Sequence, residues 1–190
     1  MPLRIQLKEE NDNLTLLIGD NCLTLQQADI LSLKADALVC PVDPLLDTQT
    51  GVAKIVMKAA GPSVRAHKPV FPEPHGKVVV LPAGYLKAKY LFLTVLLGEK
   101  NEMRRQLFVR QAVERAILYA EFLHLKSMAF PVLGSPQEAQ PYEIIAHEML
   151  GKVAEYFQRR RTKIKTIFFS SFNKTAFDTF CHEARNLAHL

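Results

Sequence analysis

The stretch from Ala35 to Asp43, ADALVCPVD, runs from apolar residues into a proline and an acid. Its apolar part predicts a short buried strand over residues 37–40, and the spacing of apolar residues over 52–60 predicts a helix. Ligands of α/β proteins bind where the carboxyl ends of strands meet the N-termini of helices. We therefore expect a ligand site at the corner formed by residues 40–53.

Two other segments fit the same rule, the loop 134–141 and the strand end 171–173. The six histidines show no metal-ligand spacing, and no order of serine, histidine and acid suggests a catalytic triad; they are His67, His75, His124, His147, His182 and His189. We expect no metal and no cofactor. Asp43 is the acid that could act as a base or orient a water molecule.

The elements that must position these residues change in type along the chain. Short β-like runs at 3–7, 14–18 and 23–25 are separated by turns, and strands then alternate with helices. The later strands are expected at 78–81, 91–97 and 164–172, and residues 127–134 are expected to form a buried strand followed by a loop. The later helices are expected at 101–123, 142–157 and 175–187. This order predicts one three-layer α/β/α domain over residues 1–190, with a mixed but mostly parallel central sheet.

Composition narrows the class of protein. Hydrophobic residues make up 48% and charged residues 23%, which is typical of a globular chain. The apolar runs are too short to cross a bilayer, and the first residues do not form a signal peptide, so no membrane partner is expected. Cys22, Cys40 and Cys181 are widely spaced and odd in number, which favours a reducing, cytoplasmic compartment.

The net charge of +5 is partly concentrated in RRRTKIK, residues 159–165. Arg159, Arg160, Arg161 and Lys163 could bind the phosphates of a nucleic acid. The other interpretation is a solvated helix end whose cations complement the helix dipole. We favour the second, because a basic run without interleaved aromatic residues carries little information.

Four motifs, in order and in register, resemble the macro domain, an α/β module that binds ADP-ribose. They are ADI at 28–30, DALVCPVD with TQTGVAKIVMKAAG, the run GKVVVLPAGYLKAKYLFLTV, and MAFPVLGSPQEAQP with the closing strand TIFFSSF. The resemblance covers about residues 28–180. It implies a macro-domain fold and a binding module for ADP-ribose or a related nucleotide-like ligand.

Part of the family's site is retained. The resemblance places Asp29, with Ile30, where a carboxylate accepts a hydrogen bond from the adenine amino group; a helix N-cap is the other interpretation of Asp29. The sequence 51–53 stands where backbone N–H groups meet the diphosphate, so Gly51, Val52 and Ala53 are candidates. Phe172 resembles the aromatic residue that packs on adenine, although we favour a core position for it.

Other positions depart from the family. Cys40 and Asp43 replace two asparagines that face the distal ribose, and an ionised Asp43 only accepts hydrogen bonds. Thr48, Gln49 and Thr50 replace a glycine run that lets the backbone approach the phosphates.

The second phosphate loop departs further. The candidates here are Gly134, Ser135, Pro136 and Gln137, followed by Glu138 and Ala139. Pro136 has no N–H to donate, Glu138 adds a negative charge, and Ala139 resists the backbone conformations open to glycine.

Catalytic residues of the family are not retained either. Ala53 stands where the hydrolases of this family carry an acid. We therefore expect binding with weakened or altered specificity and no ADP-ribosyl hydrolase activity. The alternative is a macro fold that does not bind ADP-ribose and contacts nucleic acid or protein through a basic face.

Overall fold

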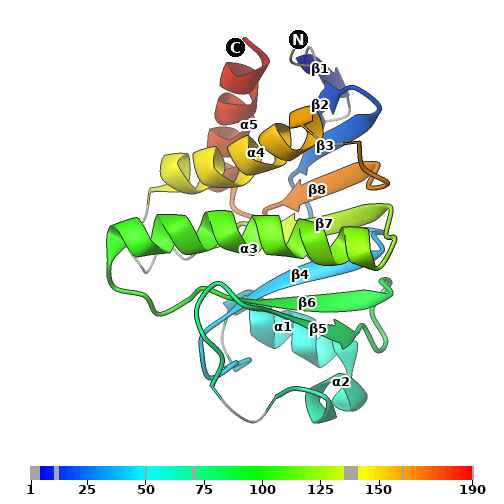
Figure 1. Cartoon of the computed structure of the whole chain (residues 1–190), viewed down its shortest axis with the longest axis vertical. Coiled ribbons are helices and arrows are strands. Elements are labelled where there is room, and N and C mark those ends of the chain that lie inside the picture. The colour runs from blue at the N-terminus through cyan, green and yellow to red at the C-terminus, as the bar shows by residue number, and fades with distance from the viewer. Residues whose placement is uncertain are drawn as a thin grey trace.

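The computed structural model describes residues 5–10, 13–49, 51–69, 72–134, 141–159 and 161–189 (Figure 1). The strands are β1 Ile5–Glu10, β2 Asn13–Ile18, β3 Asn21–Gln26, β4 Ala37–Val42, β5 Val78–Pro82, β6 Tyr90–Val95, β7 Ser127–Pro131 and β8 Thr166–Ser170. The helices are α1 Gly51–Ala60, α2 Pro62–Ala66, α3 Glu102–Phe122, α4 Tyr142–Arg159 and α5 Lys174–Ala188, with a short 3-10 helix at Ile30–Ser32.

The eight strands form one sheet in the order β1-β2-β3-β8-β7-β4-β6-β5. The five strands from β3 to β6 in that order are parallel, whereas β1, β2 and β5 are joined to their neighbours by antiparallel pairing. The carboxyl ends of the parallel strands therefore share one edge of the sheet, and their N-terminal ends share the other. Each edge collects loops that are far apart in the sequence.

Helices cover both faces of the sheet (Figure 1). One core joins α3, α4 and α5 to the sheet and contains Phe92, Phe130 and Phe157. A second core joins α1 and α2 to the other face and contains Cys40, Met57 and Leu93. Burial of this much apolar area is the main source of stability for such a fold. The expected three-layer architecture and mixed sheet are confirmed.

The boundaries of the elements differ in places from those expected. Strand β1 ends three residues later than the expected run 3–7, because its register is set by antiparallel pairing with β2. Residues 3 and 4 of that run lie outside the described residues. The strands expected at 91–97 and 164–172 are shorter, as β6 and β8 end where their neighbours in the sheet end. None of the helices in the described ranges is long and apolar enough to span a membrane.

Candidate functional site

The carboxyl edge brings the expected segments together. Gln26 of β3 and Pro131 of β7 both lie opposite Ser170 of β8, so these three strands end side by side. The ladder between β4 and β7 stops after Leu38 and Ala129, although each strand continues in register with its other neighbour. Backbone groups of the last residues of β4 on this side therefore have no ladder partner, which is the usual place for a ligand crevice in an open sheet.

Asp29 follows β3 at this edge and caps the short 3-10 helix. Its Oδ1 accepts a hydrogen bond from the Leu31 N–H at 2.9 Å, which orients the carboxylate. The loop is fixed to the neighbouring strand, because the Ser170 hydroxyl donates to the Ala28 carbonyl at 2.5 Å. The interpretation of Asp29 as a helix N-cap is confirmed. The side chain is half-buried, and its second carboxylate oxygen can still accept a hydrogen bond from a ligand. Ile30 is 5% exposed, so its side chain belongs to the core.

Phe172 lies just after β8 and is 71% exposed, so our expectation of a core position was wrong. The residues on either side cause this exposure. The Ser171 hydroxyl donates to the Asn173 carbonyl at 3.2 Å and accepts from the Asn173 N–H at 3.1 Å, which forms a tight turn around Phe172. Asn173 then caps α5 by accepting from the Ala176 N–H at 3.0 Å. The turn presents an aromatic ring at the edge that also holds Asp29.

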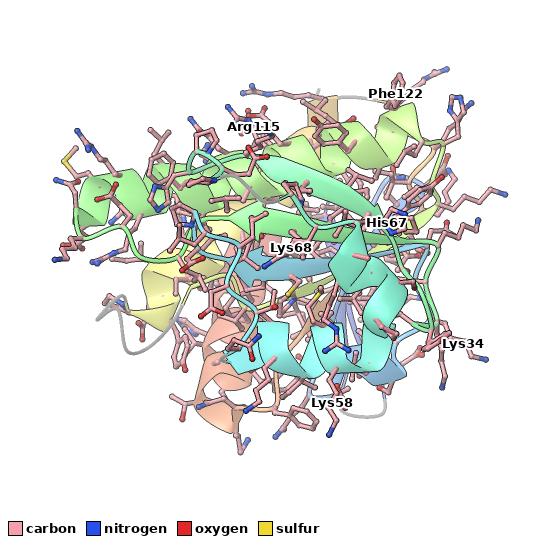
Figure 2. All side chains as sticks on the ribbon, turned by 90° about the horizontal axis from the view of Figure 1, so that it is seen from below. Lys34, Lys58, His67, Lys68, Arg115 and Phe122 are labelled. Atoms are coloured by element: carbon pink, nitrogen blue, oxygen red, sulfur yellow. The ribbon has the colours of Figure 1, made fainter. Side chains whose placement is uncertain are left out.

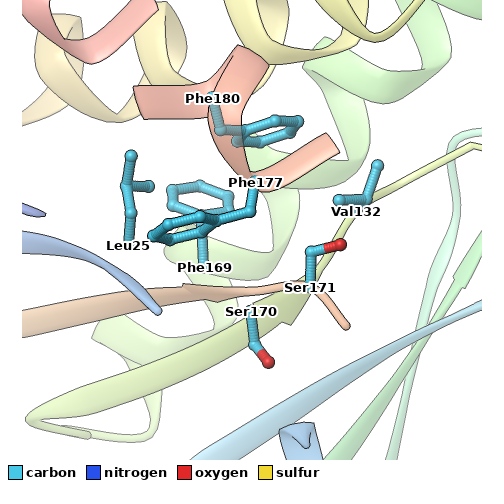
Figure 3. A pocket seen from close by; sticks show the side chains of 7 residues that line it. All are labelled: Leu25, Val132, Phe169, Ser170, Ser171, Phe177 and Phe180. Atoms are coloured by element: carbon cyan, nitrogen blue, oxygen red, sulfur yellow. The ribbon is translucent and has the colours of Figure 1, made fainter. Parts of the chain in front are cut away.

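A cluster of phenylalanines supports this end of the site (Figure 3). Phe169 stacks on Phe130 with ring centroids 5.4 Å apart and lies 6.0 Å from Phe180. These rings border a small cavity of about 10 Å³, which is lined by Leu25, Val132, Phe169, Ser170, Ser171, Phe177 and Phe180. The sequence analysis placed the strand end 171–173 at the site but did not single out Ser170 or Phe177. The signal for Ser170 was a polar residue directly after an apolar run, which is typical of a sheet edge.

The corner after β4 is a rigid hydrogen-bonded loop. The Asp43 carboxylate accepts from the Asp47 N–H at 2.7 Å, and the Asp43 carbonyl accepts from the Leu46 N–H at 2.9 Å. Leu46 is fully buried with φ of 54°, a conformation that side chains other than glycine seldom adopt. Lys68 holds it in place by donating from Nζ to the Leu46 carbonyl at 2.7 Å. One carboxylate oxygen of Asp43 is therefore already engaged in a hydrogen bond within the loop.

Cys40 has no exposed surface and belongs to the core under α1. Burial raises the pKa of its thiol to about 12. The side chain is therefore a neutral thiol at ordinary pH and is unsuited to nucleophilic attack. A ligand would have to meet this position through its backbone.

Helix α1 begins directly after the corner. Gly51 has φ of 55°, and a Cβ there would meet no atom within 4 Å, so the backbone at this position is open on its side-chain face. Val52 is half-buried and Ala53 is 4% exposed. The N–H groups of the first turn lack partners within a helix and favour an anion. Thr50 lies outside the described residues.

The second loop is described only at its start. Gly134 follows the buried Leu133 and has φ of 118°, which a residue with a side chain rarely adopts. The candidates Ser135, Pro136 and Gln137 lie outside the described residues, as do Glu138 and Ala139.

The basic run lies at the opposite edge, between α4 and β8. Arg159 donates to Glu155 at 2.7 Å, as expected of a solvated helix end. Arg161 and Lys163 are exposed, and Arg160 is outside the described residues. Among the described residues, no group of histidine, cysteine and acidic side chains could hold a metal ion.

Comparison with known proteins adds an independent observation. A family model described as Macro domain matches residues 39–149. An uncharacterized protein of Pyrobaculum aerophilum is 30% identical over 171 residues, which cover 86% of this chain and 91% of that protein. The O-acetyl-ADP-ribose deacetylase of Salmonella typhimurium is 26% identical over 160 residues, or 81% of this chain and 89% of the enzyme.

Among solved structures, a variant of the Oceanobacillus iheyensis macrodomain with ADPR (ADP-ribose) superimposes with a TM-score of 0.84. The match covers 94% of this chain and 100% of that one at 17% identity.

Proposed function

Since this chain belongs to the macro domain family, we propose that it is a binding module for ADP-ribose or a closely related nucleotide. The relatives named above include an enzyme of O-acetyl-ADP-ribose and a macrodomain solved with ADPR, which supports this ligand class. The observation that carries the proposal is that Asp29 and Phe172 lie at the same edge of the sheet. A carboxylate that accepts from an amino group and an exposed ring that stacks are the two features that an adenine needs.

The other end of the ligand would meet the corner and the start of α1. N–H groups of the first turn of α1 favour a phosphate, and the missing Cβ at Gly51 lets it approach the backbone. The charge of Asp43 and the departures in 134–139 oppose a diphosphate. We therefore propose recognition in which the adenine end provides most of the binding free energy and the phosphate end provides less than in the rest of the family.

We propose binding without hydrolysis. Ala53 is buried and carries no group that moves a proton, and the Cys40 thiol stays protonated. The Asp43 Oδ1 already accepts a hydrogen bond from the Asp47 N–H, so this oxygen is less available to orient a water molecule. The same arrangement suits a protein that holds a nucleotide and does not turn it over.

Calorimetry with two ligands tests the proposal at Asp29. ADP-ribose carries an amino group on its base, and the inosine analogue carries a carbonyl oxygen that a carboxylate repels. Wild-type protein should bind ADP-ribose about tenfold or more tightly than the analogue, since an unmatched polar contact costs about 1–3 kcal/mol. Asp29→Asn keeps an oxygen for the Leu31 N–H and gains donors, so this preference should shrink or reverse.

Asp20→Asn is the matched control, because Asp20 is exposed in the β2–β3 turn at the opposite edge. Its preference should equal that of wild type. Equal affinity of wild-type protein for both ligands, or no affinity for either, contradicts the proposal.

A further inference from the structure

The N-terminal edge of the parallel strands carries an excess of positive charge equal to the net charge of the whole chain. This basic edge consists of residues 19–20, 33–36, 83–89, 123–126 and 161–165, which lead into β3, β4, β6, β7 and β8. Together they hold seven lysine and arginine residues against two aspartates, a net charge of +5 that equals that of the whole chain. The positive and negative charges of the remaining residues therefore cancel, and the net charge is a local feature of this edge.

Hydrogen bonds place these cations on neighbouring strands. The Lys165 N–H donates to the Lys126 carbonyl at 2.7 Å, and the Lys126 N–H donates to the Asp36 carboxylate at 2.7 Å. The Lys89 N–H donates to the Asp36 carbonyl at 2.8 Å. One lysine thus starts or precedes each of β8, β7 and β6, and Lys34 precedes β4. Adjacent strands lie about 4.8 Å apart, so the row spans roughly 15 Å over four strands.

The cations of this row are accessible. Lys34, Lys126, Arg161, Lys163 and Lys165 are all exposed. Lys89 forms an ion pair of 2.8 Å with Asp36, which neutralises one of the two acids of the edge. The row therefore carries positive charge in excess of the acids beside it, which are Asp36 and Glu121, whose carboxylate accepts from the Thr162 hydroxyl. An excess of cations on one edge favours a polyanion such as a nucleic acid.

Aromatic side chains are interleaved with the lysines. Tyr85, in the turn between β5 and β6, and Phe122, at the end of α3, are each 79% exposed. Phe122 lies four residues before Lys126, and Figure 2 shows it at the same end of the molecule as Lys34. Exposed aromatic rings beside cations are the side chains on which the bases of a single strand stack.

A groove extends from Phe122 along α3 toward the edge strand β5. It has a volume of about 500 Å³ and is lined by Lys77, Val78, Arg115, Leu118, Tyr119 and Phe122. Tyr119 is 42% exposed, and the Arg115 guanidinium is held by donating to the Gly76 carbonyl at 2.5 Å. The groove thus places two rings beside the Arg115 guanidinium, whereas Lys77 forms an ion pair with Glu73 at 2.5 Å. Figure 2 shows Arg115 and Phe122 along the same helix.

We propose that the basic edge and this groove form a binding surface for single-stranded nucleic acid, separate from the nucleotide site at the carboxyl edge. The lysines of the row bind phosphates, and bases stack on Phe122 and Tyr119. Exposed rings distinguish a single strand from a duplex, whose bases already stack on one another. The proposal does not depend on ADP-ribose binding, because the proposed surface and the nucleotide site share no residue.

Fluorescence anisotropy with a labelled fifteen-residue oligothymidylate tests the surface. Wild-type protein should bind it at low salt, with an affinity that falls as salt rises. Lys126→Glu combined with Lys165→Glu should weaken binding about tenfold or more. Each lost phosphate contact lowers the slope of log K against log salt by about 0.7, so the slope should fall by about 1.4.

The matched control is Lys100→Glu combined with Arg104→Glu, which changes net charge equally at the start of α3. Binding close to that of wild type is expected. If the edge variant does not fold, as judged by circular dichroism, Lys126→Gln with Lys165→Gln replaces it. Equal losses in edge and control variants, or no binding by wild type at low salt, overturn the proposal.

Phe122→Ala tests the stacking part, with Met103→Ala as control because Met103 is 80% exposed on the same helix. Phe122→Ala should weaken binding by about tenfold at an unchanged salt slope, and Met103→Ala should not. Tighter binding to phosphatidylserine vesicles than to the oligonucleotide, or equal competition by inorganic polyphosphate, overturns the assignment to nucleic acid.

Discussion

The two edges of the parallel sheet use their aspartates in different ways. Asp36, at the N-terminal edge, accepts from the Lys126 and Ser127 N–H groups at 2.7 and 3.3 Å and pairs with Lys89 at 2.8 Å. Its own N–H donates to the Ser127 hydroxyl at 2.9 Å. Asp29, at the carboxyl edge, accepts one backbone bond within the described part of the chain. One carboxylate is saturated by the protein, and the other keeps capacity for a ligand.

This difference shows how one fold separates stability from binding. Asp36 joins the starts of β4, β6 and β7, so the N-terminal edge is fixed by bonds within the protein. At the carboxyl edge, one hydrogen bond from a backbone N–H orients each of the carboxylates of Asp29 and Asp43, and Phe172 is exposed. Substitutions at Asp36 should therefore change folding, and those at the carboxyl edge should change affinity.

The largest effect on stability is expected for Asp36→Ala. Two strand-initiating N–H groups lose their acceptor and Lys89 loses its partner, so the free energy of unfolding should fall by about 2–3 kcal/mol. Urea denaturation measures this change. Asp20→Ala, at the same edge, should change it by less than about 0.5 kcal/mol. ADP-ribose affinity should stay unchanged in Asp36→Ala; a loss there would mean that the two edges are coupled.

The second effect concerns the loop after β7. Replacing Pro136 by Gly, Glu138 by Tyr and Ala139 by Gly restores an N–H donor, removes a negative charge and relaxes the backbone. Calorimetry should show tighter ADP-ribose binding, by up to about a hundredfold if two contacts of about 1.5 kcal/mol return. Stability should change little. An unchanged affinity, with wild type already at micromolar strength, would mean that the phosphates avoid this loop.

The smallest effect is a pH dependence of stability. Burial raises the pKa of Asp36, but the hydrogen bonds from Lys89, Lys126 and Ser127 outweigh it, so this pKa lies below its ordinary value. Its stabilisation is therefore complete above the unfolded pKa of about 3.9 and is lost as pH falls through the folded value. The difference in unfolding free energy between wild type and Asp36→Asn should narrow from about pH 6 to about pH 3. A constant difference would exclude Asp36 as the titrating group.

Much of the fold could be predicted from local patterns, since the alternation of apolar runs and helical spacing depends on neighbours in sequence. The helix expected at 101–123 is present at Glu102–Phe122 because Asn101 caps it, accepting from the Arg104 N–H at 3.0 Å. Exposure was harder to predict. Phe172 was expected in the core, and a turn built by Ser171 and Asn173 turns it outward.

By itself, the sequence determined the order of the elements, the four motifs in register and the donor or acceptor chemistry of each candidate, because these depend on residue type and spacing. Only the tertiary structure decided which loops meet. Parallel pairing placed Asp29 beside the end of β8, buried Cys40 under α1, and lined up Lys126, Lys165 and Lys89 on one edge. Strand order is set by packing of both faces between residues far apart in the chain, which no local pattern encodes.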